Sequence, residues 1–145
     1  SAIGRIQLRK VEDWNKIRKR NALIMADALK DINAIRVPMP EKNIKHAWYK
    51  FYAFIKERYL ASGWNRERII SEIKQYGFPI FTGSCSEVYL ENCFRKSSLN
   101  QENRLPIARE LGETSLMLLI HPTIKETEMI NYSSCVRDVI RRASN

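Results

Sequence analysis

The residues closest to a catalytic constellation in this sequence are a cysteine and a histidine. Cys85 can supply a thiol nucleophile and His121 an imidazole base. Such a pair also needs a third residue that orients the imidazole, and none stands out in the sequence. We therefore favour the simpler interpretation, in which Cys85 lies in a polar turn, His121 ends a strand, and the two side chains do not meet.

Two further sets of residues have types suited to acid–base or covalent chemistry. Glu87 and Glu91 are four residues apart, a spacing that puts both carboxylates on one face of a helix, where they can act as an acid–base pair. Lys50 stands among aromatic residues, and an amine in apolar surroundings loses its proton more easily, as a Schiff-base lysine requires. The alternatives, which we favour, are solvated carboxylates and a lysine lying over aromatic rings.

The surplus of positive charge allows three interpretations. A formal charge of +9 is compatible with basic residues on solvated faces, with attraction to an anion such as nucleic acid or a nucleotide, or with an acidic partner domain. The clusters at residues 9–10 and 18–20 lie on one predicted helix, which is the best argument for nucleic-acid binding. That helix also carries a deep apolar stripe, and no helix-turn-helix or ribonucleoprotein signature follows it. A basic nucleic-acid-binding module is therefore kept as an alternative.

The cysteines and the apolar runs argue against several kinds of protein. Cys85, Cys93 and Cys135 are odd in number and form no C-x-x-C pair, which favours a reducing compartment, the cytoplasm, over a disulfide framework. With only two histidines, the spacing fits no common zinc pattern, so we predict no metal site. The longest apolar run, residues 116–120, is far shorter than the ~20 residues of a membrane span.

The elements that must position these residues follow from hydrophobic spacing. Apolar residues recur at helical intervals from Ile3 to Leu29, which predicts a helix over residues 1–32. A domain seldom starts inside a long helix, so we expect this chain to be the C-terminal part of a larger protein. Aromatic residues over 46–56 predict a half-buried strand, with Lys50 and Tyr52 on a face that reaches solvent or a ligand.

The rest of the sequence predicts shorter elements. Asn65 is a good N-cap for a helix that ends at Gly77, a left-handed C′ residue. The other predicted elements are a strand at 78–82, a polar turn at 83–86, a helical turn at 88–94, a polar loop at 95–103, a helix from Pro106 closed by Gly112, a buried strand at 114–120 and a last helix after a capping box at 123–126. Strands separated by helices predict an α+β fold in one domain: a small, roughly three-stranded sheet with helices packed mainly on one face.

Three stretches of the sequence together resemble one family. Residues 1–8 (SAIGRIQL) are similar to its A-A-I-G-x-x-Q-L helix, and residues 76–89 (YGFPIFTGSCSEVY) to its G-I-P … G-S-C-x-E-I-Y segment. Residues 105–123 (LPIARELGETSLMLLIHPT) are similar to its P-x-A … S-L-x-x-x-x-H-P-T segment. In order and spacing, over essentially the whole chain, these stretches resemble the DegT/DnrJ-type sugar aminotransferases.

The resemblance implies a dimeric, fold-type I enzyme that depends on pyridoxal phosphate and transfers an amino group from glutamate or glutamine to a keto sugar, usually attached to a nucleotide. It implies that residues 1–145 are the small C-terminal domain and that the helix over 1–32 links to a large domain. That large domain would hold the Schiff-base lysine and most cofactor contacts, and no lysine here, Lys50 included, matches the family's motif. A relative that dehydrates its substrate, with histidine in place of that lysine, is a second alternative.

The resemblance also implies that the small domain forms a wall of the active-site cleft. By position, we expect the substrate-binding residues to be Gly83, Ser84, Cys85, Ser86 and Tyr89. Backbone N–H groups and the two serine hydroxyls can donate to a sugar or phosphate oxygen. Many members have a His-Tyr pair near this point, where this sequence has Ser84-Cys85. His121 matches a family position, which we interpret as structural.

Overall fold

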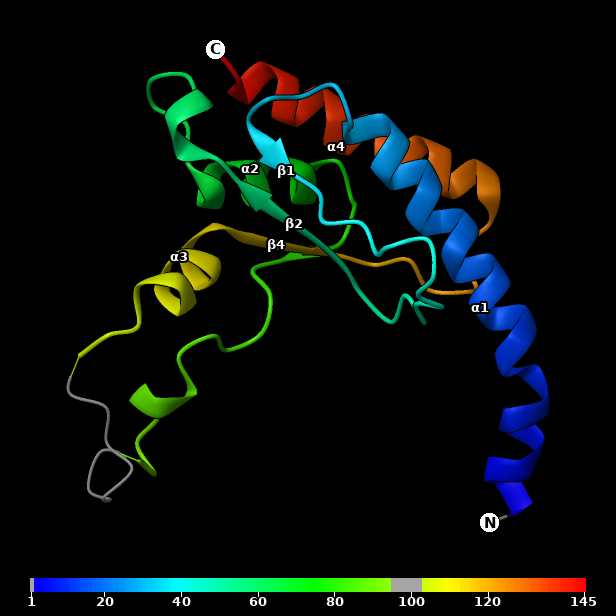
Figure 1. Cartoon of the computed structure of the whole chain (residues 1–145). Coiled ribbons are helices and arrows are strands. Elements are labelled where there is room, and N and C mark those ends of the chain that lie inside the picture. Colours follow the sequence, from blue (N-terminus) through cyan, green and yellow to red (C-terminus); the bar gives the residue numbers. More distant parts are fainter. Residues whose placement is uncertain (1, 95–102) are drawn as a thin grey trace.

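The computed structural model describes residues 2–94 and 103–145 of the chain. Its helices are α1 (Ala2–Leu29), α2 (Arg66–Gln75), α3 (Pro106–Thr114) and α4 (Glu126–Ala143), with the 3-10 helices η1 (Glu57–Tyr59) and η2 (Val88–Leu90). Its strands are β1 (Ile35–Arg36), β2 (Phe51–Ile55), β3 (Ile80–Phe81) and β4 (Ser115–Leu118). They form one antiparallel sheet in the order β1-β2-β4-β3 (Figure 1). The predicted α+β fold is confirmed.

The number of strands differs from the prediction. The described residues form four strands in place of about three, because β1 is only two residues long and too short to leave a periodic signal. It nevertheless extends the sheet, since Ile35 is paired with Ile55 of β2 and the N–H of Lys56 donates to the carbonyl of Ala34 at 2.8 Å. The loop predicted at 95–103 lies outside the described residues except at its end.

Alternation along the strands gives the sheet one buried face. In β2 the side chains of Phe51, Ala53 and Ile55 are buried, and Leu118 of β4, the register partner of Phe51, is buried as well. The side chains between them, such as Tyr52, point to the opposite face and are half-buried. The sheet therefore separates an apolar core from a second, more accessible face.

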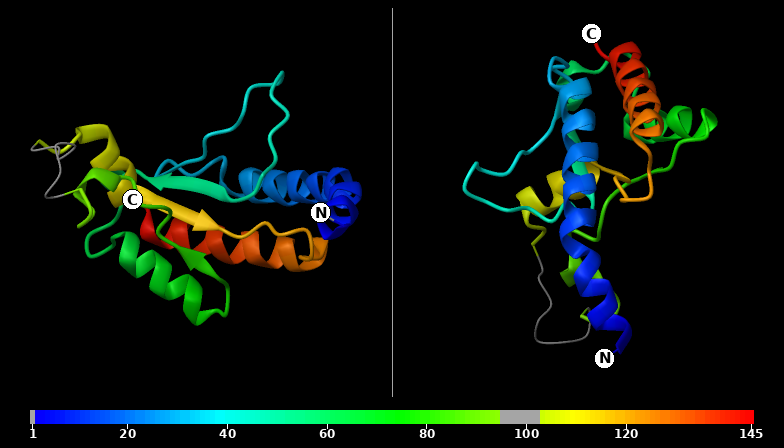
Figure 2. Two further views of the ribbon diagram at one scale, coloured as in Figure 1. Left: turned by 90° about the horizontal axis from the view of Figure 1, so that it is seen from below. Right: turned by 90° about the vertical axis from the view of Figure 1, so that its right-hand side faces the viewer.

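Three helices cover the buried face. Figure 2 shows α1 and α4 side by side, and the apolar stripes of α1, α2 and α4 share one core cluster with the sheet. The stripe of α4 agrees with the prediction and comprises Met129, Tyr132, Val136, Val139 and Ile140. Helix α3 contributes no buried residue and lies near β2. Helices are therefore packed mainly on one face, as predicted.

The N-terminal half of α1 extends beyond this core (Figure 1). The stripe over residues 22–29 is buried, but Ile3, Ile6 and Leu8 are 75%, 53% and 71% exposed. The apolar pattern that predicted the helix thus continues past the part of it that the described residues cover. At its other end α1 stops at Leu29, three residues before the predicted end.

The caps predicted for α2 are confirmed. The Asn65 side chain accepts a hydrogen bond from the N–H of Arg68 at 2.8 Å, which satisfies a donor in the first turn of the helix. Gly77 has φ 82° and follows the last turn, where its N–H donates to the carbonyl of Lys74 at 2.9 Å. Both ends of this helix follow from local chemistry alone.

The predicted starts of α4 and β2 are wrong. Helix α4 begins at Glu126, and its first turn is closed by the Glu128 carboxylate, which accepts from the N–H of Lys125 at 3.0 Å. The hydroxyl of Thr123, expected to cap the helix, lies 2.9 Å from Nδ1 of His121 instead. Strand β2 begins at Phe51, five residues late, because the chain before it turns.

The predicted role of Gly112 is also wrong. This glycine does not close α3, which continues to Thr114. A Cβ at Gly112 would stand 2.2 Å from Oγ of Ser86, so a larger residue would have to displace the Ser86 side chain where the 83–86 turn packs on the helix. A packing contact, which has no local signature, therefore explains this residue.

Candidate functional site

The turn at residues 83–86 lies on the accessible face of the sheet. Gly83 has φ 93°, and a Cβ there would stand 2.7 Å from Oγ of Ser115 and 3.1 Å from a ring carbon of Tyr52. Only glycine combines that backbone conformation with so close an approach to the strands. The next residue, Ser84, is then placed with its hydroxyl 2.9 Å from that of Tyr52.

A groove opens where Ser84 meets the segment that leads into β2. It has a volume of about 670 Å³ and is lined by Pro38, Met39, Pro40, His46, Trp48, Tyr49, Lys50, Tyr52 and Ser84. Of the predicted substrate-binding residues, Ser84 is the one that lines this groove. The aromatic sequence of residues 46–56 predicted a further part of it. It placed Lys50 and Tyr52 on a face that reaches solvent or a ligand, and both side chains line the groove. The prolines, Met39 and His46 were missed because they belong to an irregular segment.

The groove supplies binding chemistry and no acid–base pair. Its polar groups are the paired hydroxyls of Tyr52 and Ser84, the imidazole of His46 and the ammonium of Lys50, which lies 5.8 Å from the centre of the Tyr49 ring. Aromatic faces and hydroxyls suit a ring that carries hydroxyl groups, and a lysine suits an anion. No carboxylate of residues 2–94 or 103–145 lines it.

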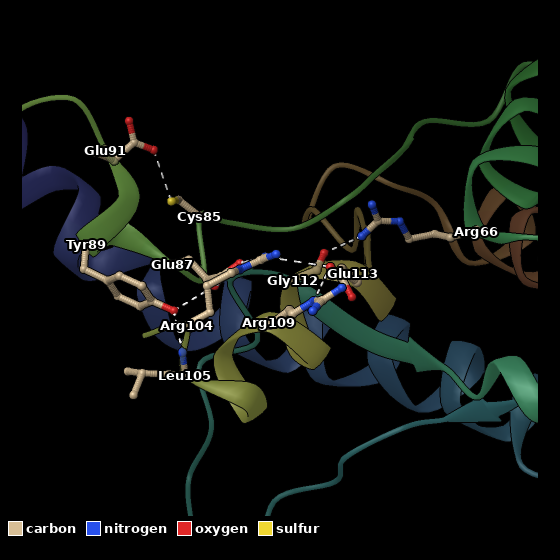
Figure 3. A network of polar contacts seen from close by, with 10 residues as sticks. All are labelled: Arg66, Cys85, Glu87, Tyr89, Glu91, Arg104, Leu105, Arg109, Gly112 and Glu113. Carbon is tan, nitrogen blue, oxygen red and sulfur yellow. Dashed lines mark hydrogen bonds and ion pairs between the residues drawn. The ribbon is translucent and has the colours of Figure 1, made fainter. Parts of the chain in front are cut away.

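Below the turn, a polar network fastens η2 to the start of α3 (Figure 3). The Glu87 carboxylate accepts hydrogen bonds from the hydroxyl of Tyr89 at 2.7 Å and from both Nε and Nη2 of Arg104. The Tyr89 hydroxyl in turn accepts from the N–H of Leu105 at 2.9 Å. Arg104 also lies 3.7 Å from Glu113 of α3. Tyr89, one of the predicted substrate residues, therefore has contacts that hold η2 against the start of α3. We call this network of Glu87, Tyr89, Arg104 and Leu105 the clamp.

The network fixes the charge of its carboxylate. Hydrogen bonds from Arg104 and then from Tyr89 lower the pKa of Glu87 to about 2. Burial and the neighbouring Glu87 carboxylate raise the pKa of the Tyr89 hydroxyl. Glu87 is thus ionised at any physiological pH and is unsuited to the role of a proton donor.

The structure does not bring together Glu87 and Glu91, the acid–base pair that the sequence allowed but that we did not favour. Glu87 and Glu91 flank the three-residue η2, and they have different partners. While Glu87 pairs with Arg104, the Glu91 carboxylate accepts a hydrogen bond from the thiol of Cys85 at 3.3 Å (Figure 3). The predicted helical face that would hold both is wrong, because η2 is too short to form one.

The thiol and imidazole are likewise separately engaged. The hydrogen bond to the Glu91 carboxylate raises the pKa of the exposed Cys85 thiol, the opposite of what a nucleophilic thiol needs. His121 contacts Thr123, and its carbonyl accepts from the buried side-chain amide of Asn21 at 3.2 Å. This agrees with the interpretation that His121 is structural and Cys85 a residue of the turn.

One residue of the basic clusters of α1 is engaged in packing. Arg20 turns toward the start of α4, where its guanidinium donates to the carbonyl of Ile124 at 3.2 Å and lies 3.4 Å from the Glu126 carboxylate. It also donates to the buried Asn21 side chain at 2.9 Å. At least one of the predicted nucleic-acid-binding residues therefore stabilises the packing of α1 against α4.

Two other kinds of site have no support within residues 2–94 and 103–145. No three or more histidine, cysteine, aspartate or glutamate side chains are grouped there as metal ligands would be. No helix in the same residues is long and apolar enough to cross a bilayer.

The low pKa of Glu87 predicts an acid-sensitive clamp. Because that pKa is lowered by the fold, the clamp contributes stability above the ordinary glutamate value of 4.5 and loses it as the pH falls toward about 2. We expect the NMR signal of the Leu105 amide to move over this interval. Glu87→Gln should displace it already at pH 7 and remove the pH dependence, while Glu41→Gln, outside the network, should change neither. A Leu105 signal that ignores Glu87→Gln would contradict the clamp.

Comparison with known proteins agrees with this architecture. The model of the DegT/DnrJ/EryC1/StrS aminotransferase family matches residues 1–137. An aminotransferase structure from Psychrobacter cryohalolentis is 41% identical, with a TM-score of 0.90, over 99% of this chain and 38% of that one. The E. coli GDP-4-keto-6-deoxy-D-mannose-3-dehydratase with bound hydrated PLP shares the fold at 21% identity, with a TM-score of 0.75, over 96% of this chain and 34% of that one.

A curated relative is also matched by almost the whole of this chain over about a third of its own length. The spore coat polysaccharide biosynthesis protein SpsC of Bacillus subtilis is 23% identical over 99% of this chain and 36% of its own length. The chain thus spans little more than a third of the proteins that it matches. With almost its whole length inside the family model, the chain belongs to the DegT/DnrJ/EryC1/StrS aminotransferase family.

Proposed function

We propose that the chain is the small C-terminal domain of a pyridoxal-phosphate-dependent enzyme that transfers an amino group from glutamate or glutamine to a keto sugar. The main support is the position of Ser84. The turn assigned to substrate by the family resemblance borders a groove of about 670 Å³ whose aromatic, hydroxyl and ammonium groups suit a sugar attached to an anionic nucleotide. In this proposal the groove and the 83–86 turn form one wall of the active-site cleft.

The described residues do not fit pyridoxal phosphate by themselves. The cofactor needs a lysine for covalent attachment and an acidic partner for its ring nitrogen. Among the residues that the structure describes, Lys50 is the only lysine that lines the groove, where it lies over the ring of Tyr49, and no carboxylate lines it. We therefore assign the cofactor, and the catalytic residues, to the rest of a longer chain. The role of this chain is to bind and orient the sugar.

The same proposal covers the remaining parts of the protein. The exposed N-terminal half of α1 would link to a large domain that covers Ile3 and Ile6. The full-length enzyme would be a cytoplasmic homodimer that uses an amino-acid donor and a nucleotide sugar. Its place would be in polysaccharide or nucleotide-sugar biosynthesis, in keeping with the name of the B. subtilis relative.

The deciding experiment is the visible absorption spectrum of the full-length gene product, before and after addition of glutamate. We expect a cofactor band that shifts when glutamate is added, as the amino group is taken from the donor. A cofactor band that ignores both glutamate and glutamine would overturn amino transfer and favour a dehydratase-like relative. Absence of any cofactor band, together with salt-sensitive binding to duplex DNA, would favour the basic nucleic-acid-binding alternative.

A second prediction concerns Lys50 in the 145-residue chain. Incubation with pyridoxal phosphate followed by borohydride should give no stoichiometric adduct at any one lysine, because an open groove leaves Lys50 solvated and without an acidic partner. Mass spectrometry of the intact and digested chain measures this. A full adduct at one position, abolished by Lys50→Arg and kept in Lys56→Arg, would place covalent chemistry in this domain after all.

A further inference from the structure

The segment that forms the groove contains an unusual backbone conformation. Trp48 has φ 50°, in the left-handed region that bulky side chains rarely occupy, and it is the one described residue other than glycine with positive φ. Its side chain is only 6% exposed and stacks on Phe51 at the start of β2, with ring centres 6.1 Å apart. A strained residue that is also buried must be held in place by its neighbours.

The neighbour that holds it is His46. Nδ1 of the imidazole accepts a hydrogen bond from the backbone N–H of Trp48 at 3.0 Å. The same ring packs edge-on against the indole, with centroids 4.5 Å apart and planes 67° apart. One side chain thus contacts both the backbone and the ring of the strained residue.

This turn decides the shape of the groove. After Trp48 the chain reverses, which leaves Tyr49 76% exposed and brings Lys50 into the lining of the groove. His46 and Trp48 line that groove and also a second one of about 200 Å³, bounded on its far side by α1. Together with Met39 and Pro40, which also line both grooves, the pair forms the wall between them.

We infer that His46 is a positioning residue. It fixes the left-handed turn at Trp48 and thereby the placement of Tyr49 and Lys50 in the groove. The contact requires a lone pair on Nδ1, which a neutral imidazole with its proton on Nε2 supplies. The consequence for sugar binding rests on the proposed function, whereas the geometry of the turn does not.

The groups around His46 allow this assignment to be tested cleanly. The other charged or titratable side chains that line the two grooves with it are Lys19 of α1, Glu41, Lys42 and Lys45 of the preceding segment, and Tyr49, Lys50 and Tyr52. Lys45 is ion-paired with Glu12 of α1 at 3.0 Å. Histidine is the side-chain type that ordinarily changes charge between pH 5 and 8. The chain has only one other histidine, His121.

The test follows the backbone amide signals of the tryptophans in the 145-residue chain labelled with nitrogen-15 tryptophan. Trp14 and Trp64 serve as internal references for the signal of Trp48. His46→Asn keeps an acceptor near the position of Nδ1 but does not titrate, and His46→Ala removes the acceptor. His121→Asn controls for the second histidine. The spectra need neither cofactor nor sugar, so the result is independent of the proposed transferase activity.

At neutral pH we expect the Trp48 signal of His46→Ala to be displaced from that of the natural chain, because the acceptor for its N–H is lost. In His46→Asn, which restores an acceptor, the signal should lie close to that of the natural chain, and His121→Asn should leave it unchanged. The inference is overturned if His46→Ala and the natural chain give the same Trp48 signal. A displacement as large in His46→Asn as in His46→Ala would overturn it as well.

Discussion

Phe51→Ala should lower the free energy of unfolding by about 3–5 kcal/mol, the range for removing an aromatic ring from a packed core. Phe51 is fully buried at the start of β2, is paired with Leu118 of β4 and stacks against Trp48. Its loss would open a cavity between the sheet and the helices that cover it. Chemical denaturation of the 145-residue chain, followed by circular dichroism, measures the change.

The matched control is the neighbouring exposed aromatic residue. Tyr49 is 76% exposed, so Tyr49→Ala should change the free energy of unfolding by no more than about 0.5 kcal/mol. Equal losses in the two variants would mean that the buried face of the sheet does not carry the stability assigned to it.

The second large effect is expected at the turn that carries Ser84. Gly83→Ala combines a left-handed backbone with a Cβ placed 2.7 Å from Oγ of Ser115, and we expect it to cost about 1–3 kcal/mol of stability. Because the turn must rise from the sheet to relieve the clash, the 2.9 Å contact between Ser84 and Tyr52 should be lost with it. In the full-length enzyme we then expect weaker binding of the sugar substrate.

Substitutions at two other glycines distinguish the cost of a left-handed backbone from the cost of a steric clash. Gly77 has φ 82° with nothing within 4 Å of an added Cβ, so Gly77→Ala measures the cost of the backbone conformation alone. Gly4 lies in α1 with open space around it, and Gly4→Ala should stabilise the helix by up to about 1 kcal/mol. Gly83→Ala should be clearly more destabilising than Gly77→Ala. Equal costs would show that the turn does not press on the sheet.

Where local chemistry decides, the sequence predicted the structure well. The caps of α2 at Asn65 and Gly77, the apolar stripe of α4 and the buried strand before His121 follow from interactions between residues close in the chain. The α+β fold follows from the same spacing rules. These signals are enough to predict the elements because the hydrogen bonds at a helix end, and the alternation of side chains along a strand, depend mainly on residues close in sequence.

Where distant contacts decide, the sequence was silent or misleading. Gly112 was interpreted as a helix stop, but it is a glycine because Ser86 packs on it from another segment. Glu87 and Glu91 have helical spacing, yet the bonds of Glu87 to Arg104 and Tyr89 remove it from any acid–base role. The strand predicted from residue 46 is interrupted at Trp48, where a turn stabilised by His46 replaces alternation.

The groove shows most clearly which features the sequence determines and which depend on the tertiary structure. By its motifs the sequence identified the family and the turn at 83–86, and by its aromatic run it indicated that Lys50 and Tyr52 face solvent or a ligand. Only the tertiary structure placed Ser84 against Tyr52 and joined the 38–50 segment to that turn. Spacing along a chain reports which residues share a helix or strand face. It carries no information on which two loops, more than thirty residues apart, meet across the edge of a sheet.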